Sequence, residues 1–121
     1  MKLINNTLLG VGLQAIAEAA TLGQKAGLER NHLLDVLAQT TVVAPAHKGK
    51  LKNAQRNEYE ANFPLRLMHK DFGLALEMAA ELRVPMPTTA VAQQLCAAEL
   101  AKNEEEDFSA TIRLMNELAK L

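Results

Sequence analysis

The sequence predicts an all-α fold, a bundle of five to six helices around a long, mostly buried N-terminal helix. Residues 1–27 are apolar on nearly every side of a helical wheel, which is typical of a helix with neighbours on several sides. Later segments repeat apolar residues at helical spacing, and no stretch alternates apolar and polar residues as a strand does. The 121 residues suffice for one core, so we expect residues 1–121 to form a single helical domain.

The N-terminal helix is predicted over Met1–Gly27, where Gly27 is a favourable left-handed cap. Lys2 and Asn6 lie one turn apart at its open end, on the face that continues into apolar residues. A cation and an amide on a core-directed face need polar partners, because an unpaired buried polar group costs a few kcal/mol. We therefore interpret Lys2 and Asn6 as part of an active site.

The same helix contains the pattern G-x-G-x-x-A at Gly10–Ala15. A dinucleotide site needs this pattern directly after a strand and at the start of a helix, so that free N–H groups meet the pyrophosphate. Here the pattern lies inside a helix with no strand before it. It therefore predicts close helix packing and not a nucleotide site.

The middle of the chain predicts a second helix over Glu29–Thr40 and a break at Thr40–Pro45, where β-branched residues lead into a proline. His47–Arg56 is basic and has few apolar residues, which predicts a short exposed helix or a loop. A strong helix follows over Pro64–Arg83, with proline in its first turn.

The C-terminal third begins with a hinge at Val84–Pro87, which contains two prolines. A helix is predicted from Pro87 to about Lys102, and the acidic run Glu104–Asp107 forms a polar turn. Ser109 is the expected N-cap of the last helix. The inward residues of that helix are expected to be Ile112, Leu114, Met115 and Leu118.

Composition excludes several classes of function. The chain is 49% hydrophobic with a formal net charge of −1. Its net charge therefore provides no overall electrostatic attraction to nucleic acid or to an anionic membrane. The single cysteine, Cys96, excludes an internal disulfide and is expected to be a small core residue. The N-terminus lacks signal-peptide features, and Leu8–Leu22 is shorter than the about 20 apolar residues of a membrane span. We therefore expect a cytoplasmic protein.

A second polar cluster, His69-Lys70-Asp71-Phe72, falls on the helix predicted over Pro64–Arg83. Asp71 lies inside the apolar arc of this helix, so we expect it to accept hydrogen bonds that fasten two helices. Lys70 lies at the border, where its cation could reach a ligand phosphate or ribose. The three histidines share no ligand spacing with other His, Cys or carboxylate residues, so we expect no metal site.

A series of short motifs, taken in order, resembles the C-terminal helical domain of the β-hydroxyacid dehydrogenases. This family includes 3-hydroxyisobutyrate dehydrogenase, tartronate semialdehyde reductase and, more distantly, 6-phosphogluconate dehydrogenase. The resemblance covers almost the whole chain. Its markers are Lys2-Leu-Ile-Asn-Asn6, Glu18-Ala19, Gly27-Leu28, Leu33-Leu-Asp-Val-Leu37, Phe63-Pro-Leu-Arg-Leu-Met-His-Lys-Asp71, Leu82-Arg-Val-Pro-Met-Pro87 and Asp107-Phe-Ser-Ala110.

The resemblance implies roles for four residues. Lys2 matches the family's catalytic lysine, a general acid/base for the substrate hydroxyl, and Asn6 matches the asparagine that binds substrate. Lys70 matches the lysine that approaches the dinucleotide, and Phe63 lies in the stretch that lines the cofactor side. The implied cofactor of the complete enzyme is NAD or NADP, the substrate is a small hydroxyacid, and the assembly is a homodimer or higher homo-oligomer.

The family's N-terminal Rossmann domain has no counterpart in this sequence, so we expect the chain alone to be inactive and to bind no cofactor tightly. The chain then acts as the substrate and dimerisation domain of a dehydrogenase, completed by a Rossmann domain or a full-length relative. The alternative is a stand-alone all-α oligomerisation or interaction module. Nucleic-acid binding through the basic residues of His47–Arg56 is a weaker third possibility, since aromatic residues are scarce there.

Overall fold

The computed structural model describes residues 1–121 and consists of six α-helices and one short 3₁₀-helix, with no β-strand. This confirms the predicted all-α fold. No helix is long and apolar enough to pass through a membrane. The elements in chain order are α1 (Lys2–Lys25), α2 (Arg30–Gln39), α3 (Pro45–Gln55), α4 (Leu65–Leu82), α5 (Pro87–Leu100), η1 (Phe108–Ala110) and α6 (Thr111–Leu118).

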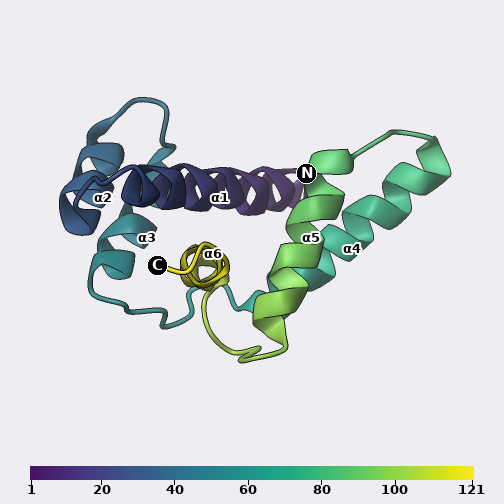
Figure 1. Ribbon diagram of the computed structural model, residues 1–121. Helices are drawn as coiled ribbons and strands as arrows, with labels where there is room; N and C mark the ends of the chain where they lie inside the picture. The colour runs from purple at the N-terminus through teal and green to yellow at the C-terminus, as the bar shows by residue number, and fades with distance from the viewer.

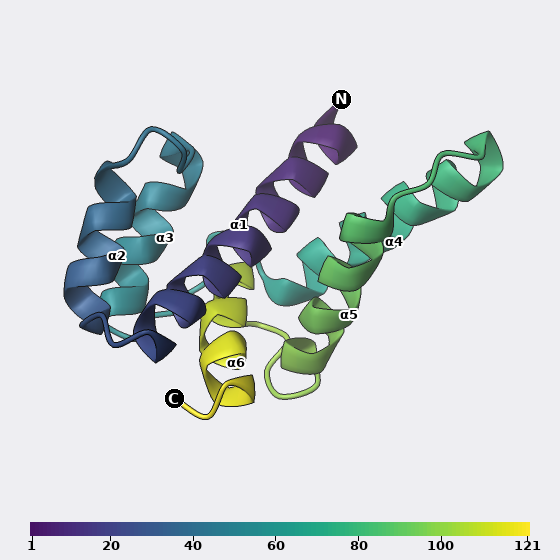
Figure 2. The ribbon, with the colours of Figure 1, turned by 45° about the horizontal axis from the view of Figure 1, so that its top comes forward.

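The helix α1 lies at the centre of the arrangement and contacts all five other α-helices. In Figure 1 the pair α2 and α3 packs at the C-terminal end of α1, the pair α4 and α5 lies at the other end, and α6 crosses beneath the middle. Figure 2 shows that the first turns of α1 project beyond α6, beside the α4–α5 pair. The N-terminal end of α1 is therefore covered less than its middle.

Burial along α1 follows one face. Its buried residues are Gly10, Leu13, Gln14, Ala17, Ala20 and Thr21. The opposite face, which the sequence also predicts to be covered, is open: Leu8 is 67% exposed and Leu22 is 72% exposed. The central position of the helix is confirmed, but its burial is one-sided because the neighbouring helices pack in pairs at its ends and not around it.

The glycines of α1 lie at helix crossings, as predicted for Gly10–Ala15. A Cβ atom on Gly10 would meet the ring of Phe72 and would lie 2.6 Å from the Met68 sulfur, both on α4. A Cβ atom on Gly12 would lie 2.7 Å from the His47 ring on α3. The missing side chains therefore allow α3 and α4 to approach α1 closely, and no glycine of this pattern is free to hold a phosphate.

Most of the predicted helix boundaries are confirmed to within a few residues. Glu29 caps α2 by accepting hydrogen bonds from the backbone N–H groups of Asn31 and His32, and these bonds lower the pKa of its carboxyl. Gly27 adopts φ +101°, in the left-handed region that the end of α1 requires. Arg83, also left-handed, ends α4.

One local prediction is wrong in part and another is wrong altogether. The helix predicted as one alternative for His47–Arg56 is confirmed by α3, which ends at Gln55, but the segment is not simply exposed, since His47, Leu51 and Ala54 are buried in it. Ser109 is not the N-cap of the last helix. The N-cap of α6 is Ala110, which makes no side-chain capping bond, whereas Asp107 caps η1 by accepting from the Ser109 backbone N–H. Aspartate and serine are both favoured N-cap residues, so the sequence alone does not distinguish Asp107 from Ser109 as the cap.

The close approach at Gly10 gives a test of the packing. Gly10→Ala should destabilise the chain by about 1–2 kcal/mol, because overpacking costs about 1–3 kcal/mol and exceeds the gain of about 1 kcal/mol in helix propensity. The matched control is Gly49→Ala on α3, where an added Cβ meets nothing within 4 Å. That variant should gain about 0.5–1 kcal/mol. Urea unfolding measures both, and equal gains would contradict the packing at Gly10.

Candidate functional site

A hydrogen bond at the open end of α1 joins Asn6 to Asp71, a residue of the second polar cluster on α4. The Asn6 side chain is half-buried, and its Nδ2 donates a hydrogen bond of 2.7 Å to Oδ2 of Asp71 on α4. The prediction that Asp71 fastens two helices is confirmed, and its partner is Asn6. This bond uses the donor side of the carboxamide, so the acceptor Oδ1 is left for another group.

The two lysines of the predicted site remain free of protein partners. Lys2, one turn before Asn6, is exposed, and so is Lys70, which directly precedes Asp71. Neither forms an ion pair or a side-chain hydrogen bond, although five other cations of the chain are paired with carboxylates. The structure therefore places Lys2 at an open surface and not on the core-directed face that the sequence suggests.

Phe63 lies apart from Asn6 and Asp71. It immediately precedes Pro64, the cap of α4, whereas Asp71 lies at the end of the second turn, about 12 Å further along at 1.5 Å per residue. Its ring packs edge-on against Phe108 with a centroid separation of 6.0 Å and an interplanar angle of 82°. The structure joins Asn6 to Asp71, with Lys2 and Lys70 only as their neighbours along α1 and α4, and it leaves Phe63 beside η1.

Phe63 is held by a buried carboxylate that the sequence analysis missed as a structural centre. Asp107 is 1% exposed, and its Oδ1 accepts from the backbone N–H groups of Asn62 and Phe63 at 3.1 and 3.0 Å. Its Oδ2 accepts from the N–H and hydroxyl of Ser109 at 3.1 and 2.6 Å. The motif Asp107-Phe-Ser-Ala110 was the only signal in the sequence, and it carries no indication of the partners.

A buried ion pair completes the Asp107 centre. Lys50 Nζ on α3 lies 2.8 Å from Asp107 Oδ1, and the Lys50 side chain is only 11% exposed. Burial raises the pKa of the Asp107 carboxyl, but the hydrogen bonds from Lys50, Ser109 and Phe63 outweigh it, so the pKa lies below its ordinary value of 3.8. Lys50 is therefore a structural residue, and the basic stretch His47–Arg56 presents one cation fewer to solvent than predicted.

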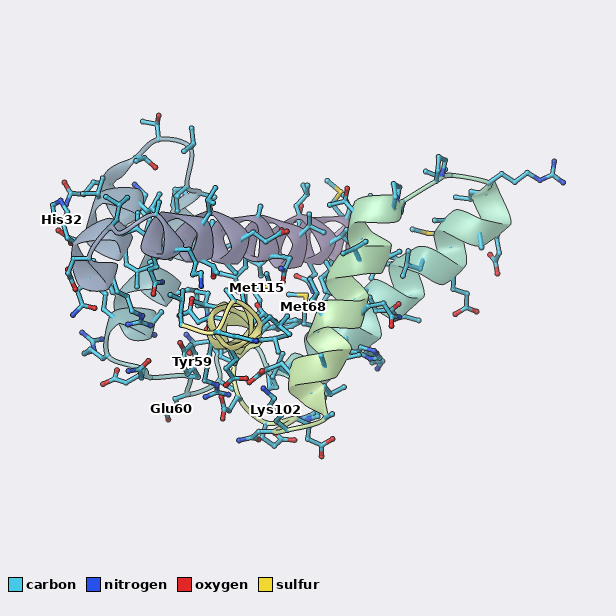
Figure 3. All side chains as sticks on the ribbon, in the orientation of Figure 1. His32, Tyr59, Glu60, Met68, Lys102 and Met115 are labelled. Atoms are coloured by element: carbon cyan, nitrogen blue, oxygen red, sulfur yellow. The ribbon has the colours of Figure 1, made fainter.

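Other candidate groups contribute no reactive centre. Cys96 is 2% exposed, as predicted for a core residue, and burial raises the pKa of its thiol to about 12. Such a thiol stays protonated and is a poor nucleophile. Figure 3 shows the polar side chains spread over the surface, and no three His, Cys, Asp or Glu residues are grouped to hold a metal ion.

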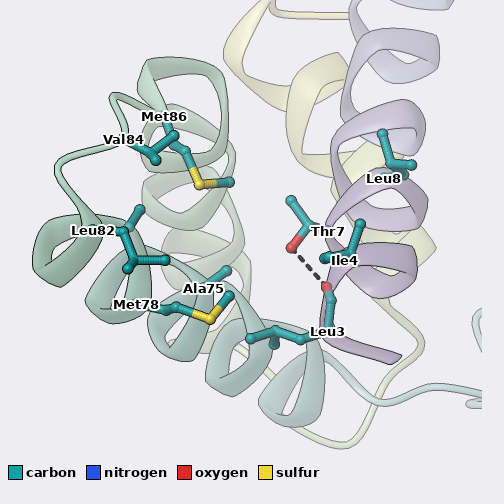
Figure 4. Close-up of a pocket in the computed structure, with 10 residues that line it drawn as sticks. Leu3, Ile4, Thr7, Leu8, Ala75, Met78, Leu82, Val84 and Met86 are labelled. Atoms are coloured by element: carbon teal, nitrogen blue, oxygen red, sulfur yellow. Dashed lines mark hydrogen bonds between the residues drawn. The ribbon is translucent and has the colours of Figure 1, made fainter. Parts of the chain in front are cut away.

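An apolar groove opens beside the polar contact, between the first turns of α1 and the C-terminal half of α4 (Figure 4). Its volume is about 300 Å³, and nine of its ten lining residues are hydrophobic. We call it the α1–α4 groove. It is lined by Leu3, Ile4, Thr7, Leu8, Ala75, Met78, Ala79, Leu82, Val84 and Met86.

Known proteins match this chain over nearly its whole length. A sequence model described as NAD-binding of NADP-dependent 3-hydroxyisobutyrate dehydrogenase matches residues 1–115. The 2-(hydroxymethyl)glutarate dehydrogenase of Eubacterium barkeri is 34% identical over 120 residues, which cover 98% of this chain and 40% of that enzyme. The chain thus spans about 40% of the length of this curated relative.

Solved structures match the fold equally well. The 3-hydroxyisobutyrate dehydrogenase of Salmonella typhimurium aligns with a TM-score of 0.84 at 26% identity, over 93% of this chain and 40% of that one. The Mycobacterium tuberculosis 3-hydroxyisobutyrate dehydrogenase, solved with L-serine, aligns with a TM-score of 0.81 at 31% identity, over 94% and 42%. In both, the match is confined to less than half of the longer protein.

The Lys50–Asp107 pair is testable by removing its cation. Lys50→Met should destabilise the chain by about 3–5 kcal/mol, because it leaves a buried carboxylate without its counter-charge. Lys52→Met, two residues away and exposed, is the matched control and should change the unfolding free energy by less than about 0.5 kcal/mol. Urea unfolding at neutral pH measures both. A Lys50→Met chain as stable as the control would contradict a structural role for this pair.

The lowered pKa of Asp107 predicts a specific acid sensitivity. A carboxyl whose folded-state pKa is depressed stabilises the fold above its unfolded-state value, near 3.8, and loses that contribution as the pH falls through the folded-state pKa. The unfolding free energy should therefore decline across this window. Asp107→Asn should be less stable at neutral pH and should show a shallower decline. Urea titrations at a series of acidic pH values measure how steeply the unfolding free energy of each chain falls with pH. Identical slopes for the two chains would exclude Asp107 as a source of the acid sensitivity.

Proposed function

The chain belongs to the 3-hydroxyisobutyrate dehydrogenase family, as its C-terminal helical domain, and on this premise we propose that it supplies the proton-transfer and substrate-binding groups of an NAD(P)-dependent hydroxyacid dehydrogenase. Residues 1–121 act as one helical unit in this proposal. Lys2 is the general acid/base, Asn6 binds the substrate, and Lys70 and Phe63 contact the cofactor. A small hydroxyacid is the substrate class.

The observation that carries the proposal is the bond between Asn6 and Asp71. Because Asp71 occupies the amide nitrogen, Asn6 offers its oxygen, which can accept a hydrogen bond from a substrate hydroxyl. Lys2 lies one turn away on the same helix face and is unpaired. Its amine can accept the hydroxyl proton as the alcohol carbon is oxidised, and it can return that proton to the carbonyl oxygen in the reverse direction.

The residues of this chain can contact only part of a dinucleotide cofactor. Lys70 is an exposed cation that can meet a phosphate or ribose, and a nicotinamide supplies the hydride chemistry in such enzymes. The glycines of Gly10–Ala15, however, are packed against Phe72 and His47 and form no phosphate loop. We therefore propose that a second domain holds the cofactor and that this chain alone binds it weakly.

The catalytic proposal is tested in a fusion protein that places this chain after the nucleotide-binding part of the Eubacterium barkeri relative. The fusion should oxidise small hydroxyacids with NAD or NADP. Lys2→Ala should lower its turnover by about 10²–10⁴-fold, the usual contribution of general acid/base catalysis, with assembly unchanged by light scattering. The exposed Lys25→Ala, at the other end of α1, is the matched control and should retain full turnover.

Two outcomes would contradict this proposal. A correctly folded fusion without activity towards any small hydroxyacid would count against the substrate class. An active fusion in which Lys2→Ala and Lys25→Ala behave alike would exclude Lys2 as the acid/base. Titration calorimetry of the unfused chain with NADPH separately tests whether cofactor binding needs the second domain.

A second candidate function, a homo-oligomerisation module, is favoured by the α1–α4 groove. The groove is almost entirely apolar, and Leu8 and Leu82 at its walls are both 67% exposed. Apolar surface of this kind is usually covered by another protein. A second copy of the chain is the simplest occupant, since the apolar walls of two grooves can pack against each other about a two-fold axis.

The oligomer proposal predicts a position-dependent effect of charge on α1. Leu8→Glu, in the groove, should shift the chain from dimer to monomer by more than about tenfold in dissociation constant, since a desolvated charge costs more than 1.4 kcal/mol. Leu22→Glu, equally exposed but outside the groove, should leave association unchanged. Analytical ultracentrifugation measures both. A wild-type chain that remains monomeric at high concentration would contradict this function without touching the catalytic proposal.

A further inference from the structure

A buried amide on α1 has no partner in the protein. Gln14 is 6% exposed, and neither its Nε2 nor its Oε1 forms a hydrogen bond with any protein atom. Leaving a buried donor or acceptor unpaired is costly, so such groups in folded proteins are nearly always paired with protein or with ordered water. The Gln14 side chain therefore points to a missing partner inside the core.

Gln14 borders a small cavity where α1, α4, α5, α6 and η1 meet. The cavity has a volume of about 10 Å³, which is about the size that one water molecule needs. Every residue that lines it is buried. Its apolar walls include Met68 and Phe72 from α4, Ala92 from α5 and Phe108 from η1.

The cavity has a second polar residue besides Gln14. Thr111, the first residue of α6, lines it, and the Thr111 hydroxyl donates to the Phe108 carbonyl at 3.1 Å. That bond uses the hydroxyl proton and leaves the lone pairs of Oγ1 to accept. Cys96 also lines the cavity, but its thiol hydrogen is directed to the Leu65 carbonyl at 3.7 Å. Gln14 and Thr111 are thus the groups with hydrogen-bonding capacity to spare.

We propose that this cavity is a binding site for one ordered water molecule, which accepts from the Gln14 amide and donates to the Thr111 hydroxyl oxygen. A buried water needs two to four polar partners and space of its own size, and the site offers both. The bridge links the middle of α1 to the start of α6. It fixes the rotation of α1 about its axis, because any turn of the helix would separate the amide from the cavity.

The proposal is tested directly on the unsubstituted chain. A high-resolution crystal structure should contain one density peak at hydrogen-bonding distance from both the Gln14 amide and Thr111 Oγ1. In solution, the Gln14 side-chain NH₂ should show a cross-peak to water with the sign of a rigid contact, which requires a residence time beyond a nanosecond. The exposed Gln94 NH₂ provides the comparison in the same spectrum and should lack such a contact.

A substitution distinguishes a hydrated amide from a dry one. If water pairs the amide, Gln14→Leu removes those hydrogen bonds and should not raise the urea midpoint relative to the surface control Gln94→Leu. If the amide is unpaired, the same change removes a buried cost and raises the midpoint. The proposal is overturned by that rise, by a cavity without density, or by a crystal structure in which the Gln14 amide bonds protein atoms.

Discussion

The structure depends on how closely two other helices can approach α1. At Gly10 and Gly12 the side chain is reduced to hydrogen, and the space is taken by Phe72 and Met68 from α4 and by His47 from α3. His47 uses the same approach to place its Nε2 at 2.8 Å from the Leu9 carbonyl. Because one helix provides both contacts, the positions of the α2–α3 and α4–α5 pairs are coupled through it. The Asn6–Asp71 bond is made within this packing, one turn before Gly10.

The sequence predicts the helices well because their signals are local. Prolines at 45, 64 and 87, the left-handed Gly27 and the apolar spacing each act within a few residues. The errors concern partners far apart in the chain. Lys50 was expected to be solvated, yet Asp107 lies 57 positions away and buries it. The face of α1 with Leu8 and Leu22 is predicted to be covered and is open, since no single-sequence pattern tells which side of α1 stays uncovered.

The candidate site, like the fold, was only partly predictable from the sequence. The pairing of Asn6 across helices could be anticipated from Asp71, a carboxylate inside an apolar arc that had to find a donor. The exposure of Lys2 could not be anticipated, because burial at a helix end depends on which elements pack around it and not on helical spacing. The polar groups that stabilise the fold, Asp107 with Lys50 and Glu99 with Arg113, are separate from those available for chemistry. Lys2 and Lys70 take part in neither of these ion pairs and are exposed.

The two proposed functions meet on the first two turns of α1. Lys2 and Asn6 lie on one face of these turns, and Ile4 and Leu8 lie on the side that lines the α1–α4 groove. These two faces point to different sides of α1, so a surface that covers the groove leaves the face of Lys2 and Asn6 open to a ligand. The proposed assembly on the apolar side and the proposed substrate binding on the polar side are therefore physically compatible, because each uses a different face of the same helix end.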